Sequence, residues 1–541
     1  MQPAPRSPAR DEVPSEGSGV ASADPGAALA SQRRLLHCSD LPRGWVTWLP
    51  ALVLLALALT LRLWGLGAIH ELIFDETYYV KDGYTLWQEG VEMQWPDEAN
   101  PAFEAGAVDT YLPAGERVVH PSLGKWIIGA GMSALGADSA VGWRISVALA
   151  GSLNVLMTVR IARRLLRSGS MGAIAGGLLA IDGLHLVMSR TSLLDTVLMV
   201  FVLAAFGALL IDRDQHRERL ARISAAALTG AVAADAGRSW RPWRLLAGVL
   251  LGMACSVKWS GLYVLAVFGI MTVLWDWWAR RTVREPRWAL KGLTRDAIPA
   301  FFAMVPTAIA VYIASWTGWL VTDKGYFRDW ARTHGHEGDS PVIDGLRSLW
   351  EYHRDSYAFH VSLSDPHPYA ASPLGWLLQL RPTNFYYRDF DFGEAGCRVE
   401  QCSAQVMSVG NPLIWWLGTA AIAVAVFAGI RWRDGRAWAI LAGIAAGYLP
   451  WLLYLDRTVF TFYSIVFEPW LVMCLAYAIG LALGPAGTAG SPSSLRRPAV
   501  LAVGALLVLI VLVSAFFWPI WTGQVIDHEQ WQWRMWLPSW P

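Results

Sequence analysis

Residues 45–66, WVTWLPALVLLALALTLRLWGL, form the first long apolar stretch of the chain. A helix needs about 20 mostly apolar residues to cross the hydrocarbon core of a bilayer, and this stretch is long enough. It is followed by HELIFDETYYVKDGY (70–84), in which Asp75 and Glu76 are adjacent. Two carboxylates at the exit of a membrane span are costly unless they lie in a wet, functional cavity. The pair therefore indicates chemistry at the outer membrane surface.

The composition of the 541-residue chain supports a polytopic membrane protein. Hydrophobic residues make up 54% of the chain and charged residues only 16%, which is too apolar for an ordinary soluble protein. Basic stretches alternate with neutral or acid-containing segments, and they lie at residues 160–167, 213–219, 279–295 and 431–436. The positive-inside rule predicts such an alternation. Because apolar helices flank each basic stretch, we expect membrane lipids and not nucleic acid as the surroundings of these residues.

Hydropathy and the distribution of Lys and Arg predict an all-α polytopic fold with about 11 transmembrane helices. The predicted spans are residues 45–66, 139–159, 171–188, 192–211, 243–257, 259–277, 297–316, 411–430, 437–454, 460–482 and 499–518. All basic loops then lie on one side, which places the N-terminus in the cytoplasm. An odd number of spans places the C-terminal end outside.

This topology divides the chain into five parts, two of which carry large extracytoplasmic loops. Residues 1–42 are rich in Pro, Ala, Ser and Gly and are expected to form a disordered cytoplasmic tail. The other parts are a transmembrane module at 43–316 with a first outer loop at 67–138, an extracytoplasmic loop at 317–410, transmembrane helices at 411–518 and an extracytoplasmic tail at 519–541. Long loops are usually functional, so we expect the site in the outer loops.

Several charged residues lie at the predicted outer ends of spans. They are Arg144, Arg190, Asp195, Lys258 and Arg457, and the segment HPSLGKW (120–126) adds His120 and Lys125. One such residue alone is more often a snorkelling anchor or an ion-pair partner. Several beside an acidic pair favour a site that binds an anion and holds a carboxylate base. Arg or Lys at headgroup depth would bind a lipid phosphate, and a carboxylate could deprotonate an acceptor hydroxyl.

The cysteines predict one short-range disulfide and no metal site. Cys397 and Cys402 are close together in the second outer loop, where an oxidising environment favours a bridge between them. The segment HGHEGD (334–339) holds two His and two acidic residues, but in an irregular loop we interpret them as solvated. No group of residues has the spacing of zinc ligands.

The chain resembles the protein O-mannosyltransferases of family GT39, membrane glycosyltransferases of the GT-C class, and is most similar to their actinobacterial form. The resemblance covers nearly the whole chain after the tail, and seven segments in the same order carry it. They are IFDETYYVKDG (73–83), HPSLGKW (120–126), GWRISVALAG (142–151), SRTSLLDTVLMVF (189–201), SVKWSGLY (256–263), residues 364–387 and DRTVFTFYSIVFEPW (456–470). The chain lacks room for the lumenal β-trefoil domain of the eukaryotic members and lacks their His-rich pattern near the end.

The resemblance implies a fold and an activity. The implied fold is GT-C, and the implied reaction transfers mannose from polyprenyl-phosphate-mannose to Ser or Thr of secreted or membrane proteins, with inversion of configuration. Inversion suits a single displacement with one base. By this resemblance Asp75 is the expected base, Glu76 is a structural or acceptor-loop partner, and Arg144 and Lys258 bind the donor phosphate.

The same resemblance gives the expected partners and surroundings. They are the lipid-linked donor, Ser/Thr-containing acceptor proteins and the secretion machinery, at the plasma membrane with the active site on the extracytoplasmic face. No cofactor is expected to be required, because cationic side chains can neutralise the leaving phosphate; dependence on a divalent metal is left open.

Two other functions fit parts of the sequence. Another GT-C enzyme, adding sugar to lipid or cell-wall glycan, would share the acidic pair but not HPSLGKW together with SVKWSG. A secondary transporter would have inverted repeats and charges at mid-bilayer depth, whereas the charges here lie at the outer ends.

Overall fold

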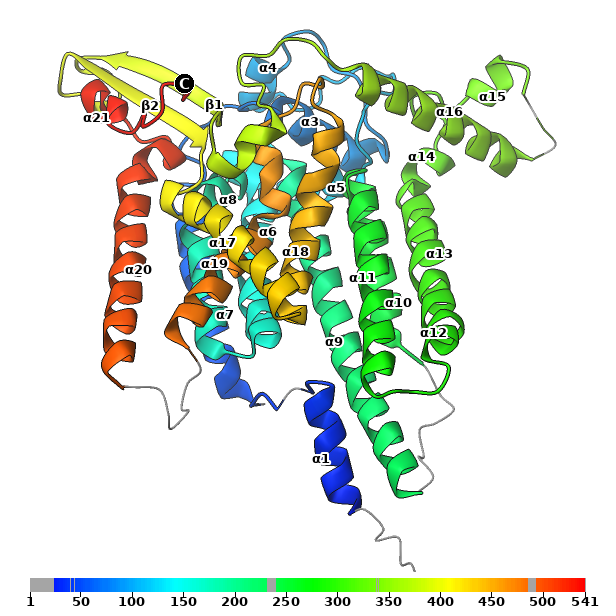
Figure 1. Ribbon diagram of the computed structural model, residues 1–541. Coiled ribbons are helices and arrows are strands. Elements are labelled where there is room, and N and C mark those ends of the chain that lie inside the picture. Colours follow the sequence, from blue (N-terminus) through cyan, green and yellow to red (C-terminus); the bar gives the residue numbers. More distant parts are fainter. Residues whose placement is uncertain are drawn as a thin grey trace, which may run out of the picture.

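The computed structural model describes residues 24–230, 240–484 and 493–540, except Ser39, Arg43, Glu337 and Asp339. Long helices run side by side as a bundle, and shorter helices and strands cover one end of it (Figure 1). We call this covering the outer-loop layer, and it consists of residues 67–138, 317–410 and 523–540. The acidic pair lies in this layer.

Eight helical segments of the described chain are long and apolar enough to cross a membrane, and three more are apolar but shorter. The long ones are α2 (Leu49–Leu63) with η1 (Trp45–Trp48), α6 (Ala140–Leu166), α9 (Leu194–Thr229), α11 (Gly261–Thr282), α13 (Ile298–Ser315) with α12 (Trp288–Lys291) and η2 (Gly292–Ala297), α17 (Pro412–Arg431), α18 (Gly435–Tyr448) with η5 (Leu449–Leu453), and α20 (Ser493–Thr522). The short ones are α7 (Gly169–Ile181), α10 (Pro242–Val257) and α19 (Glu468–Leu483). Each of the eleven predicted spans overlaps one of these helices, in the predicted order. The polytopic helical fold is confirmed, and the number of helices that cross the bilayer stays a prediction.

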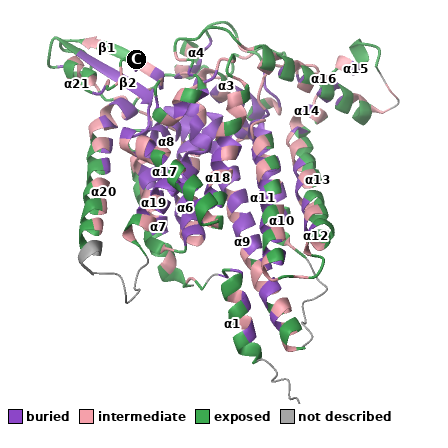
Figure 2. Ribbon diagram, in the orientation of Figure 1, coloured by how far each residue is buried: buried purple, intermediate pink, exposed green. Residues whose placement is uncertain are grey.

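Burial separates central helices from peripheral ones. In the most apolar window of α9, 78% of the residues are buried, against 17% for α2, α13 and α20. Figure 2 shows α6, α8 and α9 largely buried, while α13 and α20 at the two sides of the bundle carry many exposed residues. Exposed apolar residues such as Phe301, Phe302 and Leu512 fit helices that face lipid, where apolar side chains need no protein cover.

The outer-loop layer contains the remaining elements near the site. Its helices are α3 (Glu76–Glu89), α4 (Asn100–Glu104), α5 (Leu123–Leu135), α14 (Thr317–Val321), α15 (Trp330–Thr333), α16 (Pro341–Ser362), η3 (Pro373–Leu378), η4 (Glu394–Gly396) and α21 (His528–Gln532); α8 (Gly183–Met188) and η6 (Thr461–Val466) lie beneath them. The helix α3 ends at Gly90, whose positive φ of 81° closes the helix without the steric cost of a side chain.

The same layer holds a small antiparallel sheet that the sequence analysis did not predict. Its strands are β1 (Thr383–Asp391), β2 (Gln401–Ser408) and β3 (Ile526–Asp527), in the order β1-β2-β3. A shift of register between Asn384 and Tyr386 marks a bulge in β1. Because β3 belongs to the C-terminal tail, the sheet joins that tail to the second outer loop.

Part of the predicted disordered tail is ordered. Residues Pro25–Leu35 form α1, whose first turn is capped by the side chain of Asp24. Arg33 forms an ion pair with Glu218 of α9 at 2.6 Å, and Leu36 packs against the same helix. The expectation of disorder is therefore wrong for residues 25–35, because a tertiary contact stabilises a helix of low hydrophobicity; residues 1–23 lie outside the described residues.

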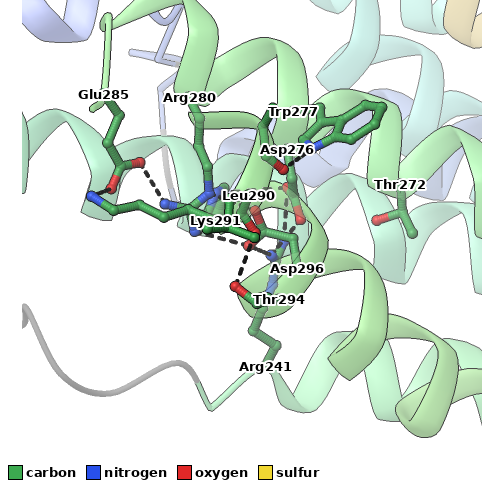
Figure 3. A network of polar contacts seen from close by, with 12 residues as sticks. Arg241, Thr272, Asp276, Trp277, Arg280, Glu285, Leu290, Lys291, Thr294 and Asp296 are labelled. Carbon is green, nitrogen blue, oxygen red and sulfur yellow. Dashed lines mark hydrogen bonds and ion pairs between the residues drawn. The ribbon is translucent and has the colours of Figure 1, made fainter. Parts of the chain in front are cut away.

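A network of ion pairs joins α9, α10, α11 and η2 at the opposite end of the bundle (Figure 3). Its arginines are Arg241, Arg244 and Arg280, and its carboxylates are Asp212, Asp276 and Asp296. His216, Asp276 and Asp296 place ligand atoms within 4.8 Å of one another, as a metal site would. The three arginines already bind these carboxylates and balance their charge, so a divalent cation would leave excess positive charge in a buried place. We interpret the network as a structural link between spans.

Candidate active site

The acidic pair stands at the start of α3 in the outer-loop layer. Asp75 is the N-cap residue of the helix and Glu76 is its first residue. Neighbouring side chains on a helix diverge by about 100°, so the two carboxylates point to different surroundings. Glu76 is completely buried, whereas Asp75 is half-buried.

Glu76 is bound on both of its carboxylate oxygens. Arg144 donates to them through Nε and Nη2 at 2.8 and 2.7 Å. The backbone amides of Ile73 and Ser192 add hydrogen bonds of 3.1 and 2.8 Å. These bonds leave Glu76 no access to a substrate, and they join α3 to α6 and to the segment before α9.

Arg144 was expected to bind the donor phosphate, and its geometry argues against that role. Besides its two bonds to Glu76, it donates to the backbone carbonyls of Leu66, Ile69 and Glu71 at 3.4, 2.6 and 2.8 Å. A guanidinium has five N–H groups, and all five are used. The side chain is only 3% exposed. We therefore interpret Arg144 as a residue that holds the first outer loop in place, and phosphate binding by Arg144 stays a prediction.

Lys258 and Asp195 form a buried ion pair beside Asp75. The Lys258 ammonium lies 2.9 and 3.1 Å from the two carboxylate oxygens of Asp195, and 4.1 Å from the ring centre of Tyr463. Asp195 lies in the first turn of α9, and Lys258 occupies the extended break between α10 and α11. Two of the predicted outer-end charges, Asp195 and Lys258, therefore lie beside Asp75.

Burial raises the pKa of Asp75 to about 6, while the positive charge of Lys258 lowers it, Asp195 raises it and a hydrogen bond with Tyr79 lowers it. At neutral pH the carboxylate is therefore mostly ionised but holds a proton more readily than an exposed aspartate. A general base is most effective when its pKa lies near the working pH. Asp75 forms no ion pair with any other residue that the structure describes.

His120 and Arg457 both contact His360 of α16, which joins them to each other. The His120 and His360 rings stack with 5.3 Å between their centres. Arg457 donates from Nη2 to His360 Nδ1 at 3.0 Å, and His360 Nε2 donates to the carbonyl of Val119 at 2.8 Å. Burial and the charge of Lys258 hold the pKa of His120 well below its ordinary value, so its ring is neutral. The buried Nε of Arg457 has no hydrogen-bond partner among the described residues.

Lys125, in the same segment as His120, has a different environment. Its ammonium is 2.6 Å from Glu92 and 3.3 Å from Asp82, and the side chain is 1% exposed. Ser122 also donates to Glu92, at 2.7 Å. Lys125 is therefore a buried ion-pair partner inside the first outer loop. The segment HPSLGKW holds one residue at the site and one in the core of the loop.

Arg190 binds backbone at the end of α2. It donates to the carbonyls of Leu61, Arg62, Trp64 and Gly65 at distances between 2.7 and 3.2 Å. These are the carbonyls that a helix leaves without partners at its C-terminus. Arg190 thus caps the first span and is not at the site.

The structure brings together five of the predicted residues, Asp75, Asp195, Lys258, His120 and Arg457, and uses four others, Glu76, Arg144, Lys125 and Arg190, to hold them. His360 and Tyr79 also touch this group and were not predicted from the sequence. A buried cluster between spans was not predicted either; in it Arg62 contacts His185 at 2.5 Å, and the completely buried Glu468 lies beside Asp182. The signal for Glu468 was available, because it is a lone acid in the apolar stretch FYSIVFEPW.

Cys397 and Cys402 are joined by a disulfide in the structure. Cys402 pairs with Phe390 across the β1-β2 ladder, so the bridge closes the far end of this hairpin. Cys38, Cys255 and Cys474 are free and buried. The predicted pair is therefore the one that the fold brings together.

Two family models match the chain. The model for dolichyl-phosphate-mannose-protein mannosyltransferases matches residues 52–321. The model for the C-terminal four-transmembrane region of protein O-mannosyltransferases matches residues 345–540. Together they cover residues 52–540 except 322–344, a part of the second outer loop.

Curated relatives and one solved structure agree with these matches. The polyprenol-phosphate-mannose–protein mannosyltransferase of Mycolicibacterium smegmatis (strain MKD8) is 36% identical, covering 91% of this chain and 93% of the relative. The enzyme of that name from Corynebacterium glutamicum is 32% identical, covering 90% and 92%. The Saccharomyces cerevisiae Pmt1-Pmt2 protein O-mannosyltransferase complex, solved with its sugar donor, superposes with a TM-score of 0.68 at 15% identity, over 96% of this chain and 95% of that one. At this identity the yeast likeness shows the fold.

The bonds of Arg144 predict a structural phenotype. Arg144→Ala leaves the buried Glu76 charge unpaired, and breaking a buried pair costs about 3–5 kcal/mol. We expect a lower apparent unfolding temperature in detergent, and little rescue by Arg144→Lys, because a lysine cannot bind Glu76 with two parallel bonds. Glu76→Gln should also lower it. A fully stable Arg144→Ala protein whose only defect is a raised KM for the donor would restore the phosphate-binding role.

Proposed function

The chain belongs to the dolichyl-phosphate-mannose-protein mannosyltransferase family, and on that premise we propose that Asp75 is its catalytic base. The protein is a multi-pass membrane mannosyltransferase of the GT-C class, whose substrates are a lipid-linked mannose donor and acceptor proteins. The observation that supports the proposal is the contrast among the carboxylates at the site. Glu76 is bound by Arg144 and Asp195 by Lys258, whereas Asp75 remains free of ion pairs within the described chain.

The proposed step is a single displacement. The Asp75 carboxylate takes the proton of a Ser or Thr hydroxyl while that oxygen attacks the anomeric carbon of mannose. The bond between this carbon and the phosphate oxygen breaks, and the electron pair leaves with the polyprenyl phosphate. Attack opposite to the leaving group inverts the configuration. No covalent enzyme intermediate forms in this step.

We propose Arg457 and Lys258 as the cations that bind the donor phosphate, with Arg457 in the place first given to Arg144. Arg457 has a buried Nε without a partner in the described chain, and its charge acts on both His120 and His360. Lys258 already binds Asp195, so it contributes charge and orientation together with that carboxylate. Charge-assisted bonds to phosphate are among the stronger hydrogen bonds in proteins.

We also propose the orientation and the supply of the acceptor. The outer-loop layer faces the cell exterior and the N-terminus lies in the cytoplasm, because the end of the bundle opposite to that layer carries basic residues such as Arg33, Arg164 and Arg241. Acceptors reach the site as unfolded chains from the secretion machinery. A half-buried carboxylate is more accessible to an extended segment than to a folded surface.

Asp75→Asn should reduce transfer by about 10²–10⁴-fold, the usual contribution of a general base, with the stability of the protein unchanged. The assay uses purified membranes, radiolabelled polyprenyl-phosphate-mannose and a Ser/Thr-rich peptide. Unfolding temperature and membrane insertion are the controls. Full activity of Asp75→Asn would remove Asp75 as the base, and label in lipid-linked glycan instead of peptide would favour another GT-C activity.

The pH profile of kcat/KM should rise with pH through about 6 and level off above it. A protonated carboxyl cannot accept a proton, so activity falls about tenfold for each pH unit below the pKa of the base. Because Lys258 lowers this pKa and Asp195 raises it, Lys258→Met should move the acid limb to higher pH and Asp195→Asn to lower pH. If the acid limb lay at the same pH in the wild type and in both variants, Asp75 would be excluded as the group whose titration causes it.

We propose that the reaction needs no divalent metal, because Arg457 and Lys258 supply positive charge to the leaving phosphate. Transfer activity measured after dialysis against EDTA should equal that of untreated membranes. The pH is held fixed to separate chelation from titration of Asp75. A loss of activity that added Mg²⁺ or Mn²⁺ restores would contradict this proposal.

A further inference from the structure

The residue before Asp75 has an unusual backbone. Phe74 lies in the left-handed region with φ = 53°. A bulky residue rarely adopts this conformation, which glycine adopts without steric cost. Strained residues of this kind occur where the surrounding structure enforces them, often at functional sites. The surroundings of Phe74 must therefore stabilise its left-handed conformation.

The ring of Phe74 is surrounded by four other rings. It stacks on Phe385 with 4.8 Å between centres, and it meets the edges or faces of Phe462, Phe460 and His367 at 5.6, 5.7 and 6.2 Å. We call these four residues the aromatic cage. Phe385 belongs to β1 and His367 to the second outer loop, while Phe460 and Phe462 come from the segment before α19. Two parts of the chain that are far from Phe74 in sequence thus hold its side chain.

The cage is itself fixed by backbone bonds between these segments. The amide of Ala371 donates to the carbonyl of Val459 at 2.8 Å, and the amide of Thr458 donates to the carbonyl of Leu363 at 3.2 Å. His367 and Phe460 also contact each other at 4.9 Å. The cage is therefore a joint platform of the second outer loop and the segment 458–462.

The chain is equally constrained on the other side of Asp75. The Glu76 carboxylate accepts a hydrogen bond from the backbone amide of Ile73 and forms an ion pair with Arg144. The carbonyl of Asp75 accepts the amides of Tyr78 and Tyr79 at 3.0 and 3.1 Å. The Asp75 carboxylate makes no capping bond to its own helix. Its direction is therefore set by the backbone between Phe74 and Glu76 and by its hydrogen bond with Tyr79.

We propose that Phe74 is a positioning residue for the transfer reaction. Its ring, anchored in the aromatic cage, holds the left-handed backbone that aims the Asp75 carboxylate at the acceptor hydroxyl. The inference rests on the proposed role of Asp75. It assigns to the second outer loop and to residues 458–462 a part in catalysis that involves no contact with the reacting atoms.

Phe74→Gly tests this role, because glycine accepts the same backbone conformation but has no ring to anchor it. We expect kcat to fall by about 10²-fold, as for other small misplacements of a reacting group, with little change in the KM for polyprenyl-phosphate-mannose. The acid limb of the pH profile should move to higher pH as the carboxylate leaves the positive charge of Lys258. Phe74→Tyr keeps the ring and should restore most of kcat.

Phe327→Gly is the matched control. Phe327 also has a positive φ, of 60°, and stacks on Tyr326 with 4.4 Å between ring centres, in a separate apolar cluster between the two outer loops. It should leave kcat and the pH profile as in the wild type. Phe385→Leu keeps the backbone of residue 74 and removes its stacking partner, so it should lower kcat in the same direction by a smaller factor. It also serves as the test if Phe74→Gly fails to fold.

The positioning role would be overturned if Phe74→Gly had wild-type kcat and an unmoved acid limb. If the glycine variant does not fold, the same result in a folded Phe385→Leu protein would overturn it. Equal losses in Phe74→Gly and Phe327→Gly would also overturn it, because they would indicate a general effect of losing a loop phenylalanine. Asp75→Asn, measured alongside, separates the two proposals. An active Asp75→Asn protein refutes the base, whereas an inactive one beside a fully active Phe74→Gly protein refutes only the role of Phe74.

Discussion

The ion pair between Glu76 and Arg144 fixes the chain between the first span and α3, and the position of Asp75 depends on it. Both groups are buried, and a buried pair is stable only when further hydrogen bonds satisfy its remaining donors and acceptors. Here the backbone supplies them, through three carbonyls of the chain before α3 and two amides. The chain between the first span and α3 is therefore wrapped around one guanidinium. Arg190 extends the same principle to the end of α2, where it binds four carbonyls.

This arrangement explains why two adjacent carboxylates can have opposite properties. Glu76 receives four hydrogen bonds and serves as a structural anchor. Asp75, one residue earlier, points to a half-buried site, where burial raises its pKa to about 6. The anchored glutamate makes the position of the aspartate reproducible, and the aspartate needs no ion pair of its own to stay in place. Separation of a rigid support from a reactive group is the usual way in which a site is preorganised.

The sequence predicted what depends on local pattern and missed what depends on tertiary partners. Hydropathy located a helix in each of the eleven ranges, because the apolar length of a span is a local property. Charge at the end of a span identified Arg144 and Arg190, and the segment HPSLGKW identified Lys125. The same local signal, however, fits a phosphate ligand, a buried ion pair and a helix cap. Only the fold shows which carbonyls and carboxylates surround each cation. The sheet and α1 were missed for a related reason, since each is stabilised by contacts with segments distant in sequence.

Charge balance at the site connects donor binding to the proposed base. Asp75 and Asp195 carry two negative charges, and Lys258 and Arg457 carry two positive ones. A bound mannosyl phosphate adds a negative charge, which raises the pKa of a neighbouring carboxylate and makes Asp75 a stronger base. As the bond to mannose breaks, the phosphate gains further negative charge, and the proton on Asp75 becomes more favourable still. On the proposed mechanism, departure of the phosphate and transfer of the proton therefore assist each other. Lys258 and Arg457 lower the electrostatic cost of the negative charge that develops on the leaving phosphate in this half-buried site.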